Sequence, residues 1–286
     1  MSLNRQQNEE LLHWQSKLIL LATLPLLAAY AVLATGQALW LGQHVAWQAL
    51  AISAAFGILV FSLRAATAFA AFTGALITAT LYYWTPGWHT ALWPLLALFL
   101  LTFAATKFGR RHKEKMGTAE GKRGRTASQV AANLGVAALA SIPMSSGHLF
   151  TNSVPGRVSL IAMLAALAEA TADTLSSELG QVLGGEPRML TTFRRVPPGT
   201  DGGISFPGTV AGCAGAAVVI GVAFVSLHLR LWEVSVAWIG GVVGLFADSL
   251  FGATLERRGW LNNDAVNFLS TLVAALVGAW LWGVWR

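Results

Sequence analysis

The sequence predicts an all-α, polytopic membrane protein of about nine transmembrane helices with its N-terminus in the cytoplasm. Of its 286 residues 55% are apolar and only 11% are charged, whereas soluble domains are about 25% charged. Several apolar stretches reach the roughly 20 residues that a helix needs to cross a bilayer. Lysine and arginine are concentrated between alternate stretches, as expected for loops on one side of a membrane.

Nine apolar segments divide the chain. They lie at 18–34, 45–63, 66–84, 90–106, 130–143, 158–179, 204–229, 234–254 and 265–285. The fifth is short and rich in Gly and Ala, so it could be tilted, broken or re-entrant. The polar residues 1–17 lack a convincing cleavage site for a signal peptide. We therefore expect a cytoplasmic N-terminal segment, 1–17, followed by a single transmembrane domain, 18–286.

The positive charges predict the orientation. With nine spans and the N-terminus inside, sixteen of the nineteen Lys and Arg residues lie on the cytoplasmic side, and only Arg157, Arg230 and Arg286 lie outside. This bias supports both the helix count and the orientation. It also explains the net charge of +6 without a nucleic-acid partner. Membrane lipids are the expected neighbours, in the inner membrane of a prokaryote or an equivalent membrane.

Acidic residues within the apolar segments are the first candidates for a site, because a charge inside a membrane helix is costly and usually marks a function or a pair. Asp173, Glu178, Asp248 and Asp264 all fall in the cytoplasmic half, and Glu169 lies one turn deeper. One buried carboxylate alone could simply bond two helices, but four together favour a cavity neutralised by cations. Because an oxygen-rich site suits Mg²⁺, we expect the ion at Asp173, Glu178 and Asp248.

The loop TTFRRVPPGTDGGIS, residues 191–205, is the second candidate. Two arginines precede a Pro-Pro break and a glycine-rich run that opens onto the next helix. Glycines let backbone N–H groups approach an anion, and a helix N-terminus adds a favourable dipole. An ordinary Pro/Gly turn with solvated arginines is the alternative. The expected phosphate-binding residues are Arg194, Arg195, Gly199, Thr200, Gly202, Gly203 and Ser205.

The loop at 107–129 holds eight Lys and Arg residues, most of which are expected to set orientation and contact lipid headgroups. Arg123 and Arg125 nevertheless precede the fifth helix directly, and Asn133 lies inside it, which again favours an anion site. The stretch GTAEGKR is not a P-loop, because it has one residue too few between its glycines and no Ser or Thr after Lys122. No HExxH or GxSxG motif occurs, and the single cysteine, Cys213, excludes an internal disulfide.

Four segments in order, ATADTLSSELG, TTFRRVPPGTDGGIS, GLFADSLFGA and LNNDAVNFLST, resemble the integral membrane family that contains plant phytyl-phosphate kinase and its animal and prokaryotic relatives. RGRTASQVAANLG resembles a further segment of that family, and the matching order covers most of 60–286. The pattern is more distantly similar to dolichol kinases and CDP-diacylglycerol synthases. The chain departs from the family at Arg194, where relatives often have Lys, and at Asp201, where they have a small residue. A carboxylate there would repel phosphate unless it turned away or met a metal.

The resemblance implies that 18–286 is a catalytic domain. Its activity would be the transfer of a phosphoryl group from a nucleoside triphosphate, with CTP the expected donor, to a prenyl- or phytyl-type monophosphate, giving the diphosphate. Asp173, Glu178, Asp248 and Asp264 would be its catalytic or metal-binding acids, and Asn263 would lie with the nucleotide-binding residues. A homodimer is compatible with this assignment. Two alternatives stay open: another CTP-dependent lipid enzyme, such as a prenol kinase or cytidylyltransferase, and an ion-coupled transporter with access from both sides.

Overall fold

The computed structural model describes residues 12–119, 121, 124–142 and 154–286. Its elements are α2 (His13–Trp40), α3 (Val45–Ser62), α4 (Ala68–Trp84), α5 (Leu92–Lys107), α6 (Arg110–Met116), α7 (Ala127–Ser141), α8 (Val154–Leu183), β1 (Arg188–Met189), β2 (Gly203–Ile204), α9 (Phe206–Leu227), α10 (Leu231–Phe251), the π-helix η2 (Gly252–Glu256) and α11 (Asn263–Trp285). Apart from the short antiparallel pair β1–β2, the described elements are helical, which confirms the all-α, polytopic prediction.

Each of the nine predicted apolar segments contains a helix, but the expected number of spans is corrected. Six helices in the described residues are long and apolar enough to cross a membrane, or seven if α5 and α6, bent by 61° at their junction, count as one span. The reason is length: α4, α5 and α7 have 17, 16 and 15 residues, fewer than the roughly 20 that a bilayer requires.

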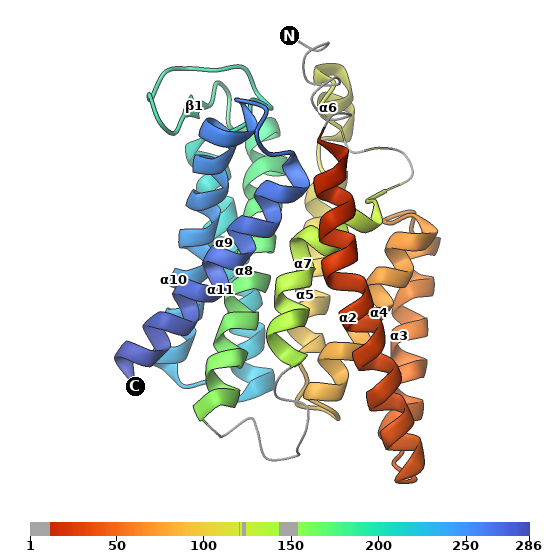
Figure 1. Cartoon of the computed structure of the whole chain (residues 1–286). Helices are drawn as coiled ribbons and strands as arrows, with labels where there is room; N and C mark the ends of the chain where they lie inside the picture. The colour runs from red at the N-terminus through yellow and green to blue at the C-terminus, as the bar shows by residue number, and fades with distance from the viewer. Residues whose placement is uncertain (1–11, 120, 122–123, 143–153) are drawn as a thin grey trace.

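Helix α8 lies at the centre of the bundle (Figure 1) and packs against α5, α7, α9, α10 and α11. In its most apolar stretch 83% of the residues are buried, against 17% for α2. Helices α2 and α3 instead expose large apolar side chains such as Leu21, Leu33 and Ile58, as expected of helices that face lipid. A polar residue on α8 is therefore held among helices and not in lipid.

Glycines, which have no side chain, allow the central helices α8 and α9 to approach each other closely. A Cβ atom at Gly208 of α9 would lie 2.5 Å from the Ser176 carbonyl of α8, and one at Gly212 would lie 2.6 Å from that of Ala172. Small residues spaced four apart are a common contact between membrane helices. This contact fixes α9 against the half of α8 that carries the candidate acids.

The polar connections gather at one end of the bundle. Figure 1 shows α6 and the α8–α9 connection with β1 at this end, whereas the C-terminus lies at the opposite end. Helix α2 begins at His13, so residues 13–17 belong to this helix and not to the separate N-terminal segment that was expected at 1–17. The described part of that segment thus reaches the same end as the α8–α9 connection.

Candidate active site

A polar cavity of about 280 Å³ lies where the ends of α7, α8, α10 and α11 meet the connection between α8 and α9. It is lined by most of the residues that the sequence singles out: Asp173, Glu178, Asp248, Arg125, Asn133, Asn263, Gly199, Thr200, Gly202, Gly203 and Ser205. It is also lined by polar residues that the sequence analysis did not select, among them Gln129, Thr174, Ser177, Gln181, Ser249, Glu256 and Asn267. Segments far apart in sequence thus form one polar site.

Asp173 of α8 and Asp248 of α10 form the acidic wall of this cavity. Both side chains line the cavity, and the two carboxylates lie close enough to interact electrostatically. Asp248 also accepts a hydrogen bond from Ser270 Oγ at 3.2 Å, and the amide of Asn267, with its nitrogen turned toward Asp248, donates at 3.2 Å. Glu256 of η2 interacts electrostatically with Asp248. The wall is therefore rich in oxygen ligands.

Glu169 lies one turn deeper in α8 and is 1% exposed. It interacts with Ser270 and Asp173, while its Oε1 has no hydrogen-bond partner among the described residues. A Cβ atom at Gly244 would lie only 2.5 Å from the Glu169 Cγ, so glycine at that position makes room for the side chain. Among the acidic residues of α8, Glu169 lies deepest in the bundle.

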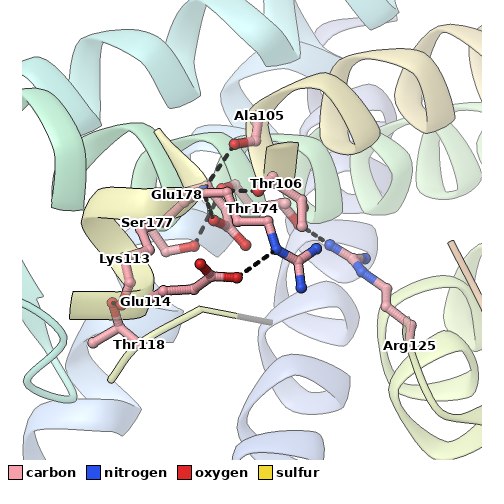
Figure 2. Close-up of polar contacts among 10 residues, drawn as sticks. Ala105, Thr106, Lys113, Glu114, Thr118, Arg125, Thr174, Ser177 and Glu178 are labelled. Atoms are coloured by element: carbon pink, nitrogen blue, oxygen red, sulfur yellow. Dashed lines mark hydrogen bonds and ion pairs between the residues drawn. The ribbon is translucent and has the colours of Figure 1, made fainter. Parts of the chain in front are cut away.

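Arg125 is held in place by backbone hydrogen bonds to the turn between α3 and α4. Its N–H donates to the Ala65 carbonyl at 2.9 Å, and its carbonyl accepts from Thr67 N–H at 3.0 Å. Gly124 permits this approach: its φ is +75°, and a Cβ atom there would lie 2.4 Å from the carbonyl carbon of Ala65. The guanidinium donates to Thr174 Oγ1 at 3.2 Å (Figure 2). A cation is thus positioned beside α8.

Glu178 is paired with Lys113 of α6, as Figure 2 shows. The lysine is 1% exposed and lies 2.5 Å from the carboxylate. From the sequence alone Lys113 is one of the orientation charges, since nothing local distinguishes it from its basic neighbours. No group of three or more His, Cys, Asp or Glu residues close enough to hold a metal occurs in the described residues. A direct metal contact of Glu178 stays a prediction, with Asp173 and Asp248 the better-placed pair.

The connection between α8 and α9 covers the cavity. It contains the β1–β2 pair, and Gly202, with φ +73°, lies against η2 so closely that a Cβ atom would meet the Ala253 nitrogen at 2.3 Å. Ser205 caps α9 by accepting from Gly208 N–H at 3.2 Å. The glycine-rich run and the N-terminus of a 22-residue helix thus face the same space as the acids.

Three expected residues lie outside the cavity lining, and a fourth is not among the described residues. Arg194 and Arg195 are exposed outside the cavity lining, and Arg195 pairs with Glu186 at 3.0 Å on the surface. Asp264 is also outside the lining, where its carboxylate accepts a hydrogen bond from Ser16 Oγ of α2 at 2.7 Å. The fourth, Arg123, falls outside the described residues. The geometry gives Asp264 a structural contact, between α2 and α11.

Comparison with known proteins identifies relatives. The chain is 44% identical over 119 residues to an uncharacterized membrane protein of Methanocaldococcus jannaschii, covering 42% of this chain and 50% of that protein. It is 31% identical over 198 residues to an uncharacterized membrane protein of Synechocystis, covering 67% and 73%. It is 28% identical over 188 residues to Protein VTE6, chloroplastic, of Arabidopsis thaliana, covering 63% and 55%.

The chain thus spans about half the length of the first and third of these relatives. No solved structure matches it significantly. A family model, described as integral membrane protein DUF92, matches residues 51–275, which include every described residue of the cavity lining. The apolar helices and this match together establish a multi-pass protein of the membrane. The chain belongs to the integral membrane protein family DUF92.

Proposed function

We propose that this protein is a Mg²⁺-dependent kinase that transfers the γ-phosphoryl group of a nucleoside triphosphate, with CTP the expected donor, to a prenyl- or phytyl-type monophosphate. The observation that carries the proposal is the cavity in which Asp173 and Asp248 face a glycine-rich loop and a helix N-terminus, with Arg125 at its edge. Phosphoryl transfer depends mainly on positioning and charge neutralisation. The site's residues offer both.

The reaction forms one bond and breaks one. A phosphate oxygen of the acceptor attacks the γ-phosphorus, and the bond from that phosphorus to the β,γ-bridging oxygen breaks. The products are the lipid diphosphate and the nucleoside diphosphate. Because a dianionic phosphate nucleophile carries no proton to remove, no general base is required. The carboxylates are therefore better suited to hold a metal ion than to accept a proton.

The donor set fits Mg²⁺. This ion is usually held by one or two carboxylates together with substrate phosphates and water, and Asp173 and Asp248 are two carboxylates on the wall of one cavity. Asn267 and Ser270 hold Asp248 from behind. When bound there, Mg²⁺ would neutralise phosphate charge and orient the transferred group. Glu256, which also lines the cavity, could take part through water.

The glycine-rich part of the lining suits a triphosphate, whereas Asp201, which also lines the cavity, would repel phosphate unless it meets the metal or turns away. Gly199 and Gly202 line the cavity, next to the N-terminus of α9. The neighbouring Gly203 N–H is already used, because it donates to the Thr200 carbonyl at 2.9 Å. Backbone N–H groups of glycine-rich loops and helix N-termini bind phosphate oxygens by hydrogen bonds and by the helix dipole. A volume of about 280 Å³ is at the lower end of ligand pockets. The cavity would therefore hold phosphates and metal, with the base and the lipid tail outside it.

Burial argues against the transporter alternative. Between Glu169 and the N-terminal end of α8, the helix presents apolar residues that are almost wholly buried: Leu160, Ile161, Leu164, Ala165 and Ala168. At the far end, Arg157 Nε donates to Glu233 Oε1 at 2.9 Å, and Trp282 Nε1 donates to the same carboxylate. A cation path across the membrane would have to open this packed core. An enzyme with access from one side needs no such path.

Product analysis tests the proposal. Purified protein in detergent is incubated with Mg²⁺ and phytyl, geranylgeranyl or farnesyl monophosphate, with CTP labelled either at the γ- or at the α-phosphorus. A kinase moves only the γ-label into a lipid diphosphate. A cytidylyltransferase moves the α-label into lipid, and a prenol kinase labels the free alcohol, which is added in a parallel reaction.

ATP replaces CTP in a further reaction to identify the donor. Folding is verified by a cooperative thermal transition and by a single symmetric peak in gel filtration. Absence of transfer to every prenyl monophosphate, from either nucleotide and with folded protein, would falsify the kinase proposal.

A further inference from the structure

We infer that an apolar groove between α3, α4, α5 and α7 binds the hydrocarbon chain of a single-chain lipid monophosphate, with the phosphate at the basic mouth of the groove. The inference rests on the proposed function, because it assigns the acceptor's place beside the same cavity. The groove has a volume of about 100 Å³. Its apolar lining includes Phe56, Val60, Leu95, Leu98, Phe99, Phe103 and Leu134.

The groove exists because α5 and α4 pack against different neighbours and leave a gap between them. Helix α5 packs mainly on α8 and α9 and makes few contacts with α4, whereas α3 packs along α4. Phe56 and Phe99 meet edge to face across the gap, with ring centroids 5.5 Å apart. Gly74 lies at the groove, where a Cβ atom would be 3.7 Å from the Phe56 ring. Its small size keeps the groove open.

The mouth of the groove is cationic. Arg64, Lys107, Arg110 and Arg125 all line it, from the α3–α4 turn, the end of α5, α6 and the segment before α7. Arg110 shares its charge with Glu114 at 3.0 Å, which leaves a positive excess at the mouth. A phosphate monoester, which is dianionic near neutral pH, complements several cations better than a singly charged diester does.

The groove and the polar cavity meet at two residues. Arg125 and Asn133 line both, and Arg125 interacts electrostatically with Asp173 of the acidic wall. A phosphate held at Arg125 would therefore lie between the apolar groove and the proposed metal site. This is where an acceptor phosphate must be if its chain occupies the groove and its oxygen attacks a triphosphate in the cavity.

The volume of the groove limits the kind of lipid that can bind in it. A cavity of about 150 Å³ holds one benzene ring, so a groove of about 100 Å³ admits a section of one chain and not the two chains of a glycerophospholipid. The rest of a long chain would continue past the half-buried Phe56 and Phe103 into the bilayer. A prenyl or phytyl monophosphate meets both requirements, one chain and one monoester phosphate.

Photolabelling tests the groove without requiring catalysis. A geranylgeranyl monophosphate with a diazirine in its third isoprene unit is irradiated with the wild-type protein in detergent, and the labelled residues are mapped by mass spectrometry. We expect labels on Phe56, Phe99 or their neighbours on α3, α4 and α5. Unlabelled geranylgeranyl monophosphate should compete, and geranylgeraniol should not. Labels confined to other helices, or equal competition by the alcohol, overturn the inference.

A matched pair of variants adds a functional measurement. Gly74→Leu fills the groove, whereas Gly221→Leu adds the same side chain to α9, where a Cβ atom has open space. We expect Gly74→Leu to lower groove labelling and transfer to geranylgeranyl monophosphate by about tenfold, equivalent to about 1.4 kcal/mol. Transfer to dimethylallyl monophosphate, which needs little of the groove, should stay near the wild-type rate. The same loss for both acceptors would overturn the inference.

The two proposals fail in different ways. Groove labelling in a folded protein that transfers no phosphoryl group would leave the binding site standing and reject the kinase. Transfer to geranylgeranyl monophosphate with labels only outside the groove would reject the groove and leave the kinase standing. If Gly74→Leu does not fold, the wild-type labelling pattern and the alcohol competition still decide the inference.

Discussion

The ammonium group of Lys113 lies 2.5 Å from Glu178 Oε2, so that a lysine only 1% exposed is paired with a carboxylate of the central helix. The same Nζ donates to the carbonyls of Ala105 and Thr106 at 3.0 Å, where α5 ends. A single cation thus satisfies the end of α5 and anchors the bent α5–α6 unit to α8. Both candidate ligand sites are bordered by elements that this contact holds together.

Removing Lys113 should destabilise the protein strongly. Lys113→Met leaves Glu178 without its cation, and loss of one partner of a buried ion pair costs about 3–5 kcal/mol. Thermal unfolding in detergent should therefore begin at a clearly lower temperature. The double variant Lys113→Met with Glu178→Leu should recover part of the loss, because it removes the unpaired charge as well.

Arg110→Met is the matched control, because it breaks an exposed ion pair on the same short helix. Exposed pairs contribute at most about 1 kcal/mol. If Lys113→Met and Arg110→Met unfolded at the same temperature, the pairing of Lys113 with Glu178 would have no stabilising role.

Asp173 and Asp264 should respond in opposite ways to the same substitution. Asp173→Asn removes a carboxylate from the acidic wall and should abolish phosphoryl transfer while leaving expression and folding intact. Asp264→Asn retains an oxygen that can accept the Ser16 hydrogen bond. It should keep transfer near wild-type rates and cost about 1 kcal/mol of stability. A folded but inactive Asp264→Asn protein would return Asp264 to the catalytic set.

Gly124→Ala should displace Arg125. The substitution forces a side chain into a left-handed conformation, at a cost of about 1–3 kcal/mol, and places its Cβ 2.4 Å from the Ala65 carbonyl carbon. We expect reduced thermal stability and a raised KM for the lipid monophosphate. Gly121→Ala is the control, since a Cβ atom there meets nothing within 4 Å. Equal behaviour of the two variants would show that the backbone contact with Ala65 does not position Arg125.

Local sequence predicts the helices well because long apolar runs leave few other structures in a membrane. It overestimates the number of spans, because the described helices α4 and α7 have only 17 and 15 residues, fewer than the roughly 20 that a bilayer requires. The gathering of Asp173 and Asp248 with the glycine-rich loop could be anticipated, since buried charge must converge on partners or ligands. That reasoning rests on the cost of charge in lipid and needs no knowledge of side-chain contacts.

Contacts between distant segments could not be anticipated. Lys113 is buried because the chain bends by 61° between α5 and α6, at Gly109, which has φ +60° and lies against Val182. Its partner Glu178 is 65 residues away. Asp264 leaves the cavity because Ser16, 248 residues away, donates to it. Both outcomes depend on which helices become neighbours, and a pattern along one helix does not specify that.

Metal and nucleotide binding should stabilise the protein only when the acidic wall is intact. A ligand that binds the folded state at 100 times its Kd adds about 2.7 kcal/mol, so Mg²⁺ with CTP should raise the unfolding temperature of the wild-type protein, and EDTA should reverse the effect. Asp248→Asn should remove the response, because it takes one of the two proposed metal-binding carboxylates from the cavity wall. Glu114→Gln, which changes an exposed carboxylate outside the cavity lining, should keep it. A full response to Mg²⁺ and CTP in Asp248→Asn would place the metal elsewhere in the molecule.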